Sequence, residues 1–410
     1  MKAIRPVRCT LARATFVTAA LAPILLAGCG GGSDDSTALS SAKLADTSSG
    51  TSSVSLSPLS STVASTLMRP AFYTAPVVLN PPSGIDSAAP FASANQPPAA
   101  QASPSTMAAV SLSQLTPQTI ARRATTTARA ATSTTQVTTY TPAQIRAAYK
   151  LPPLPSSWSN LGASEAAQMG AGQTIYVIDA MSDPNIVKEL AAFNQIFGLP
   201  GCTTTTIAPN ASLPLAAPGS NACQFSVVHS TTSGAMTSNA PPYDSGWATE
   251  IALDVQWAHA TAPLARIVLI QAPDASTSSL IAAVNLSNAM GPGVVSMSFG
   301  APEGSWTGSV DSAFKHANMT YVAATGDNGT GVEWPSVSPN VLAVGGTHLS
   351  YDGTTKNETV WSGTGGGISQ YTSVPAYQNR SVPSLGTLTK RSVADVSFNA
   401  DPYSGQYVAV

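Results

Sequence analysis

Two carboxylates stand four positions apart in a stretch of sequence that otherwise favours burial. The stretch is "GWATEIALDVQWAHATAP", residues 246–263, and it carries Glu250 and Asp254 among small and apolar residues. Residues i and i+4 share one face of a helix, which would set the two carboxyl groups roughly 4 to 6 Å apart. At an effective dielectric of about 20 two such charges repel by about 3 kcal/mol, so one proton is shared well above the usual carboxyl pKa. Such a pair is suited to general acid–base chemistry.

A solvated helix face is the alternative interpretation of this pair, and in an arbitrary helix it is the commoner one. The stretch has few other polar positions, however, and Thr249 and Gln256, seven residues apart, would form a separate stripe toward solvent. We therefore interpret Glu250 and Asp254 as placed for chemistry.

The sequence around the pair alternates between apolar strands and helices. The predicted strands are residues 174–180, 265–272, 293–300, 319–327 and 340–349, and the predicted helices are residues 183–197, 246–263, 276–290 and a segment near 310–318. Near-continuous apolar strands separated by helices indicate an α/β fold with a parallel sheet covered on both faces. Ligands of such sheets bind at the carboxyl ends of the strands, which singles out Asp179, residues 298–300 and Asp327.

A Ser-His-Asp peptidase of the subtilisin type is the first hydrolase to test. Asp179 ends a buried strand, as the aspartate of that fold does, but a suitable histidine is missing. The four histidines, His229, His259, His316 and His348, are followed by Ser, Ala, Ala and Leu, and none begins an "HGTH" helix. The triad is rejected, and another group has to serve as the base.

Residues 140–410 resemble the sedolisin family, the serine-carboxyl peptidases, which share the subtilisin fold and use a carboxylate in place of the histidine. The resemblance runs in family order through "YTPAQIRAAYKLP", "GQTIYVIDAMSDPN", the E-x-x-x-D helix, "VVSMSFG", "YVAATGDNGTG", "EWPSVSPNVLAVGGT", "SGTGGGISQYTSVPAYQ" and "SVADVSFNADPYSGQYVAV". It implies a subtilisin-like fold, with Glu250 as the general base, Asp254 as the carboxylate that tunes it, and Asp327 as the acid of the oxyanion hole.

The resemblance also implies a substrate site. Ser298, Phe299 and Gly300 would form the wall along which an extended polypeptide pairs. Without the resemblance, Asp327 reads equally well as an Asx-turn residue. Asp179 is interpreted as structural.

The implied roles agree with carboxyl chemistry. Glu250 can take a serine proton only if its pKa is raised toward the working pH, and Asp327 can donate to an oxyanion only while protonated. We therefore expect an endopeptidase that cleaves polypeptides under acidic conditions. The alternatives are a non-catalytic lipoprotein that binds peptides, and an inactive fragment.

The sequence departs from the family in two places. The family nucleophile lies in a "GTS" motif after the segment that ends this sequence at Val410, and neither "SGTG" at 362–365 nor Ser369 is a convincing substitute. The nucleophile and the calcium site that the resemblance implies are thus expected beyond Val410, with no metal site before it. The folded pro-domain of relatives is replaced by a low-complexity segment.

The first residues are typical of an export signal. A basic start is followed by the apolar "TFVTAALAPILLAG", and "LAGC" resembles the lipobox of bacterial lipoproteins, which implies a lipid anchor on Cys29. We expect a signal peptide at 1–28, a disordered tether at 29–135 and the peptidase domain at 136–410. The expected location is the bacterial cell envelope, with the outer membrane favoured, or the extracellular space. An ordinary secretory signal is the alternative.

Charge and cysteine usage limit the partners. The chain has 18 basic and 20 acidic residues and no basic run, so nucleic acid is not expected, and we expect a monomer. Cys202 and Cys223 are predicted to form a disulfide in an oxidising compartment. Zinc is poorly supported, because His229 is the only histidine near them in the sequence.

Overall fold

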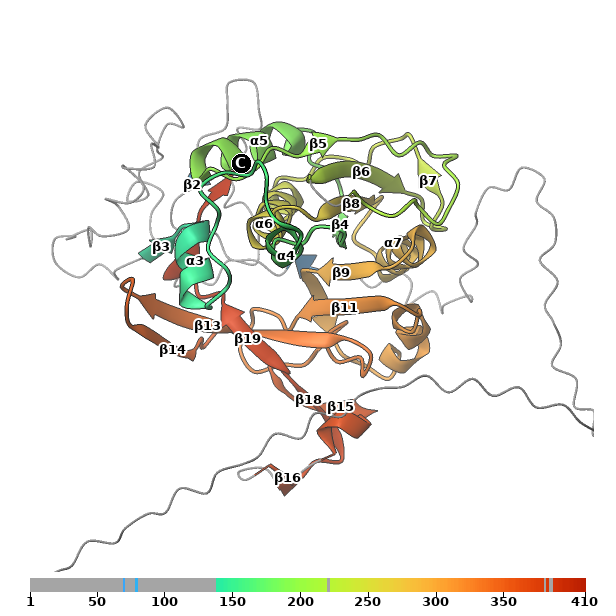
Figure 1. Cartoon of the computed structure of the whole chain (residues 1–410). Coiled ribbons are helices and arrows are strands. Elements are labelled where there is room, and N and C mark those ends of the chain that lie inside the picture. Colours follow the sequence, from blue (N-terminus) through green and yellow to red (C-terminus); the bar gives the residue numbers. More distant parts are fainter. Residues whose placement is uncertain (1–68, 71–77, 80–137, 220–221, 380, 383–385) are drawn as a thin grey trace, which may run out of the picture. The chain divides into compact units, whose positions relative to one another are not determined.

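A computed structural model describes residues 69–70, 78–79, 138–219, 222–379, 381–382 and 386–410 (Figure 1). All of these residues fall in one compact unit, Thr51–Val410. The predictions for Cys29, for the signal peptide and for most of the tether lie outside the described residues.

A mixed, mainly parallel sheet of ten strands forms the centre of this unit. Its strand order is β14 (Lys356–Val360), β13 (Leu342–Tyr351), β11 (Met319–Ala324), β9 (Gly293–Met297), β4 (Thr174–Ala180), β8 (Arg266–Ala272), β6 (Gln224–Ser230) and β5 (Thr203–Thr204), with β19 (Val396–Asn399) beside β13 and β7 (Met236–Thr237) beside β6. Every pairing is parallel except those of β14 and β7.

Helices cover both faces of the sheet, because successive strand residues point to opposite sides. Tyr176 and Ile178 of β4 belong to the apolar cluster that includes α7 (Thr277–Met290). Val177, between them, belongs to the cluster of α5 (Ile186–Phe197) and α6 (Ser245–Thr261). The predicted α/β class is therefore confirmed, and α6 lies on the opposite face from α7.

The first helix after β3 (Thr138–Tyr140) is capped at its start. Thr141 accepts a hydrogen bond from the backbone N–H of Gln144, and Pro142 opens α3 (Pro142–Ala148). A second short helix, α4 (Ala163–Gln168), follows. No described helix is both long enough and apolar enough to cross a membrane.

Three predicted elements differ from the structure. The strand predicted at 293–300 breaks at Ser298, and β10 (Phe299–Pro302) leaves the central sheet to pair with β12 (Glu333–Trp334). The helix predicted near 310–318 is a 3-10 helix, η3 (Thr307–Phe314). The prediction missed β6, because the polar residues of "QFSVVHS" interrupt its apolar run.

The remaining elements are short and complete the edges of the unit. They are β3 (Thr138–Tyr140), β15 (Gly367–Ser373), η4 (Ala376–Gln378), β16 (Ser381–Val382), β17 (Gly386–Thr387), β18 (Lys390–Val393), β20 (Ser404–Gln406) and β21 (Val408–Ala409).

Two short strands lie within the region predicted to be a disordered tether. β1 (Arg69–Pro70) pairs antiparallel with β10, and β2 (Val78–Leu79) pairs parallel with β21. Strand edges present backbone donors and acceptors that any extended segment can satisfy, so a low-complexity sequence is no barrier to such pairing. The rest of the predicted tether lies outside the described residues.

Candidate active site

The carboxyl pair lies on α6, as the sequence predicts. Asp244 caps this helix by accepting a hydrogen bond from the backbone N–H of Trp247 at 2.9 Å. Glu250 is fully buried and Asp254 is half-buried, with its Oδ2 atom inaccessible to solvent. The solvated-face alternative is therefore excluded for Glu250.

The solvent stripe predicted on the same helix is wrong. Thr249 and Gln256 are both buried. The Gln256 side chain donates to the backbone carbonyl of Ala409 at 2.7 Å and accepts from the N–H of Ala409 at 2.8 Å. The C-terminal strand β21 satisfies this amide, and that contact over 153 residues has no local signal in the sequence.

Asp179 joins the pair from the end of β4. It is fully buried, and neither of its carboxyl oxygens has a hydrogen-bond partner among the described residues. Both oxygens of Glu250 and Oδ2 of Asp254 are likewise buried without a hydrogen-bond partner within bonding distance in the described part of the chain. A structural carboxylate is normally hydrogen-bonded, so the arrangement of Asp179 differs from the structural role that the sequence suggested.

Burial dominates the protonation of these three groups. Burial raises the pKa of Glu250 well above its ordinary range, and the nearby carboxyls of Asp254, Asp179 and Asp327 raise it further. Burial likewise raises the pKa of Asp179, with Asp254 adding to the effect. Burial raises the pKa of Asp254 to about 7, against the opposing effect of a hydrogen bond from Ser298. Around neutral pH the cluster therefore holds protons that isolated carboxyls would have lost.

The three residues predicted to bind substrate have different surroundings. Ser298, between β9 and β10, donates from Oγ to Oδ1 of Asp254 at 2.9 Å. Phe299 has a fully buried side chain, which belongs to the core cluster on the α7 side. Gly300 and Phe299 pair through their backbones with β1. Phe299 could thus contribute to a binding wall only through its backbone.

Asp327 lies in the loop after β11, on another wall of the same site. Gly326 precedes it with a φ of 101°, a conformation that favours glycine, and a Cβ there would meet the carboxyl group of Glu333. Burial raises the pKa of Asp327 to about 8, and the negative charge of Glu333 contributes. The group is thereby kept protonated in acidic and neutral solution.

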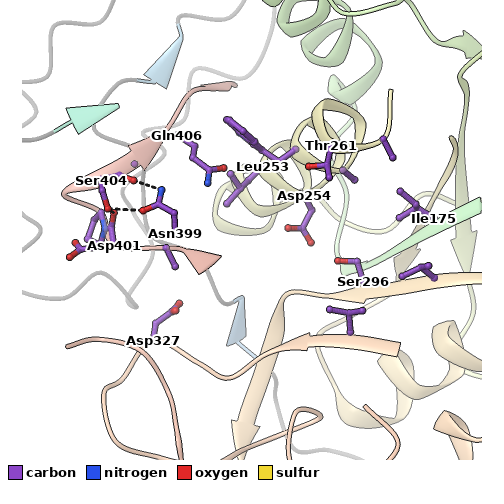
Figure 2. A pocket seen from close by; sticks show the side chains of 18 residues that line it. Ile175, Leu253, Asp254, Thr261, Ser296, Asp327, Asn399, Asp401, Ser404 and Gln406 are labelled. Carbon is purple, nitrogen blue, oxygen red and sulfur yellow. Dashed lines mark hydrogen bonds between the residues drawn. The ribbon is translucent and has the colours of Figure 1, made fainter. Parts of the chain in front are cut away.

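A groove of about 480 Å³ separates α6 from the Asp327 loop. Figure 2 shows Asp254 projecting from α6 into this groove, with Asp327 across from it. The lining includes Leu253 and Trp257 of α6, the sheet residues Ile175, Val294, Ser296 and Val322, and the loop residues Asn399 and Asp401. The sheet residues are only partly buried, whereas their neighbours Val295, Met297 and Tyr321 on the opposite face are fully covered.

Ser369 is far from suited to the role of nucleophile. It is buried, and its hydroxyl donates to Oε2 of Glu303 at 2.5 Å. Oγ of Ser369 accepts from the backbone N–H of Thr372 at 2.8 Å. These bonds hold the serine within a turn of the chain, and it does not line the groove beside Asp254 and Asp327.

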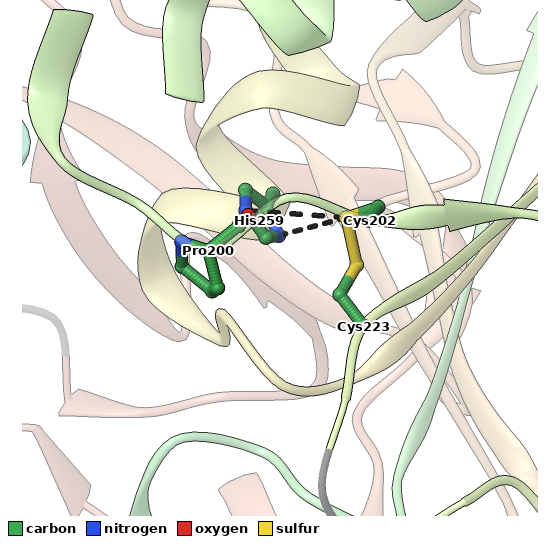
Figure 3. The surroundings of a disulfide bond; sticks show 4 residues. All are labelled: Pro200, Cys202, Cys223 and His259. Atoms are coloured by element: carbon green, nitrogen blue, oxygen red, sulfur yellow. Dashed lines mark hydrogen bonds between the residues drawn. A yellow bond between two sulfur atoms is a disulfide. The ribbon is translucent and has the colours of Figure 1, made fainter. Parts of the chain in front are cut away.

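The predicted disulfide is present between Cys202 and Cys223 (Figure 3). The histidine beside it is His259 of α6, not His229, with Nδ1 3.4 Å from Sγ of Cys202 and Nε2 3.0 Å from the carbonyl oxygen of Pro200. The sequence could not show this contact, because it spans 57 residues.

Metal ligands were sought in the same region. Cys202, Cys223 and His259 form the one group of three metal-capable side chains within the described ranges. Its two sulfurs are bonded to each other, and calcium takes oxygen ligands. This group does not fit the calcium ion that the resemblance implies.

Comparisons with known proteins agree with this geometry. Residues 245–400 match the profile of the family Peptidase_S8, described as the subtilase family. Kumamolisin from Bacillus sp. (strain MN-32) is 36% identical over 39% of this chain and 34% of its own length. Sedolisin from Pseudomonas sp. (strain 101) is 44% identical over 19% of this chain and 15% of its own length. The chain thus spans a third or less of the curated relatives that it matches.

A solved structure shows the same fold. Pseudomonas sedolisin, a serine-carboxyl proteinase complexed with two molecules of pseudo-iodotyrostatin, aligns with a TM-score of 0.50 and 23% identity. The alignment covers 66% of this chain and 73% of that chain. In sequence this chain is therefore similar to kumamolisin and sedolisin, and it has a subtilisin-like fold.

Proposed function

We propose that this chain carries the acid–base half of a serine-type endopeptidase that cleaves polypeptides under acidic conditions. The observation that carries the proposal is that Asp254 and Asp327 line one groove with Glu250 buried one helical turn before Asp254, and that all three pKa values are raised. Perturbed carboxyls gathered at a cleft are typical of catalytic sites.

Each carboxyl has a role in the proposed reaction. The carboxylate of Glu250 takes the Oγ proton of a serine as that oxygen forms a bond to the carbonyl carbon of the substrate. Protonated Asp327 donates a hydrogen bond to the resulting oxyanion. Collapse then breaks the C–N bond, and the amine leaves with the proton that Glu250 had taken. Water hydrolyses the acyl-enzyme by the same steps.

The groove supports the part of the proposal that concerns the nucleophile. It leaves space beside Asp254 and Asp327, over a partly exposed sheet face, for a segment that carries a serine. The resemblance puts this serine after the segment that ends at Val410. Glu250 is buried one helical turn before Asp254, and a serine hydroxyl that reached its carboxyl from this groove would lower its pKa toward the acidic range.

The wall of the substrate site has separate support. β10 accepts Arg69 and Pro70 as an antiparallel strand, so its backbone can pair with an extended polypeptide. The same observation favours the second candidate function, a peptide-binding protein without catalysis. On that account the 410-residue chain binds extended peptides and leaves them intact.

The location proposed for the chain is the cell envelope, with a lipid anchor on Cys29. The support is the "LAGC" motif after a short apolar run. Mass spectrometry of the protein from membranes would show the lipid mass on an N-terminal Cys29. An unmodified chain in the medium would contradict this part of the proposal.

Cleavage of an unfolded protein at about pH 4 tests the catalytic proposal. The protein is produced with the residues encoded after codon 410, as wild type and as Glu250→Gln, with Glu303→Gln as a control outside the cluster. We expect cleavage by the wild type and the control, and a loss of at least about a thousandfold for Glu250→Gln. Undiminished cleavage by Glu250→Gln would reject the base assignment, and peptide binding without cleavage by every form would favour the second candidate.

A further inference from the structure

The three buried carboxyls beside the groove share a single hydroxyl donor among the described residues. Five of the six carboxyl oxygens of Asp179, Glu250 and Asp254 have no hydrogen-bond partner there. The sixth, Oδ1 of Asp254, accepts from Oγ of Ser298 at 2.9 Å. Ser298 also lowers the pKa of Glu250, but by less than burial and the three neighbouring carboxyls raise it, whereas at Asp254 its hydrogen bond is the one effect that opposes burial.

The backbone on either side holds Ser298 in this orientation. Met297 ends β9 and Phe299 begins β10, and both side chains are buried in the apolar cluster on the α7 side of the sheet. Alternation along the strand then directs Ser298 to the opposite side, toward α6. These two anchors fix the backbone of Ser298 on the side of the sheet that faces α6.

The groups that face this cluster are acidic. Glu250 lies one helical turn before Asp254 on α6, Asp179 approaches from β4, and Asp327 acts on Glu250 from the loop after β11. Each additional negative charge in so small a volume is strongly unfavourable, so the cluster ionises one group at a time. The first charge settles where a donor stabilises it.

We propose that Ser298 is a positioning residue: its hydroxyl keeps the first negative charge of the cluster on Asp254 and leaves the proton on Glu250. This assigns Ser298 a function different from the substrate wall that the sequence suggested. It deepens the proposed function, on which it rests in naming Glu250 as the base, because the base then starts its cycle protonated. Glu250 must pass this proton on before it can accept one from a nucleophile.

The distribution of charge can be measured without any peptidase activity. The 410-residue chain is labelled with ¹³C at the side-chain carboxyls of Asp and Glu, and the chemical shifts are followed from acidic to alkaline pH. The signal of Asp254 is assigned by its loss in Asp254→Asn. In the wild type we expect Asp254 to be the first of the three groups to ionise, at a pH near its pKa of about 7.

Removal of the hydroxyl is the decisive change. In Ser298→Ala the Asp254 titration should move up by about one to two pH units, because a hydrogen bond to a charged group is lost. Ser298→Thr keeps a hydroxyl and should restore the wild-type titration. An Asp254 titration that stays in place in folded Ser298→Ala would overturn the proposal, as would Glu250 ionising before Asp254 in the wild type.

A second variant, Ser298→Cys, tests the proposal if Ser298→Ala does not fold. Ser298→Cys keeps the volume of the side chain with a weaker donor, so the Asp254 titration should move by a smaller amount in the same direction. No movement in a folded Ser298→Cys, together with an unfolded Ser298→Ala, would also count against the proposal. Failure of the peptidase assay would leave these titrations unaffected, so the two proposals fail separately.

Discussion

Glu250 and Asp395 each have an ionisable partner four positions away, and their surroundings are opposite. Asp395 receives two hydrogen bonds of 2.6 Å from the buried guanidinium of Arg391. Glu250 faces a second carboxyl, Asp254, and the lowering effect of the Ser298 hydroxyl on its pKa is smaller than the effects of burial and of the neighbouring carboxyls that raise it. Burial acts on both, but hydrogen bonds outweigh it and lower the pKa of Asp395, whereas the pKa of Glu250 is raised. Equal spacing therefore says little until the partner's charge is known.

The difference separates a structural pair from a chemical one. Asp395 also accepts from the backbone N–H of Ala343 and from the side chain of Gln378, so every oxygen is satisfied. A satisfied pair fixes the chain and has no proton to exchange. The Glu250 and Asp254 pair retains a proton at a groove, where a substrate could use it.

Loss of the Arg391 guanidinium should have the largest effect on stability. Arg391→Met leaves the charge of Asp395 without its partner in a buried site, and we expect a loss of about 3 to 5 kcal/mol in the free energy of unfolding. Denaturant unfolding at neutral pH measures it. The double variant Arg391→Met with Asp395→Leu should recover much of the loss, and an unchanged midpoint in the single variant would contradict the account.

The pH dependence of the free energy of unfolding should be the next largest effect. It should distinguish the pair of Glu250 and Asp254 from the pair of Arg391 and Asp395. Asp254 and Asp327 have ordinary pKa values of 3.8, raised to about 7 and about 8 in the folded state, so their stabilising effect is complete below about pH 4. The native state binds more protons than the unfolded state between pH 4 and 8, and stability falls as pH rises through that window.

Denaturant unfolding at each pH from 4 to 8 measures this fall. Asp254→Asn should flatten part of it. Asp395 has a lowered pKa, so its contribution is lost only as pH falls below about 4. A stability curve that rises from pH 4 to 8 would show that the cluster does not hold its protons.

Loss of the hydrogen-bonded amide of Gln256, which lies on α6 with Glu250, should have a smaller effect on the free energy of unfolding. Gln256→Met removes both hydrogen bonds to Ala409 and should cost about 1 to 3 kcal/mol, because the backbone groups of Ala409 are left buried and unpaired. Thermal unfolding of the variant checks this value. Glu250→Gln should cost less at alkaline pH, where it removes an unsatisfied acid, and a greater loss than for Gln256→Met would contradict the comparison.

The exposed pair of Lys356 and Glu358 should have the smallest effect. Its two side chains lie 2.6 Å apart but remain 31% and 21% exposed. Lys356→Met should change the free energy of unfolding by less than about 1 kcal/mol, since water and salt screen the pair. Its measurement beside Arg391→Met would show that burial, and not charge pairing as such, sets the larger value.

The sequence was sufficient for those elements whose apolar pattern is strong. β4, β8, α6 and α7 have the predicted type and nearly the predicted limits, because their small and apolar residues leave few alternatives. Prediction from the sequence failed where contacts between residues far apart in the chain determine the structure. The polar residues of β6 are accommodated by the strands on either side, and Gln256 is buried because Ala409 pairs with it.

The candidate site was likewise predicted only in part from the sequence. The four-residue spacing on a small-residue helix was enough to predict the pair of Glu250 and Asp254. Asp327 was a candidate because it follows a predicted strand, and its oxyanion role came only from the family resemblance. The part played by Ser298 depends on a hydrogen bond between residues 44 positions apart, which no local pattern predicts. The buried state of Asp179 depends on packing against α6 and on the register of β4, which are likewise visible only in the fold.

The most direct test of the account is whether Glu250 holds a proton where an ordinary carboxyl has lost it. Infrared difference spectra at about pH 6 report protonated carboxyls, and the comparison is of the wild type with Glu250→Gln and with Asp395→Asn. We predict that Glu250→Gln removes one protonated-carboxyl band and that Asp395→Asn removes none. A wild-type spectrum in which Glu250→Gln removes only an ionised-carboxylate band would contradict the central claim.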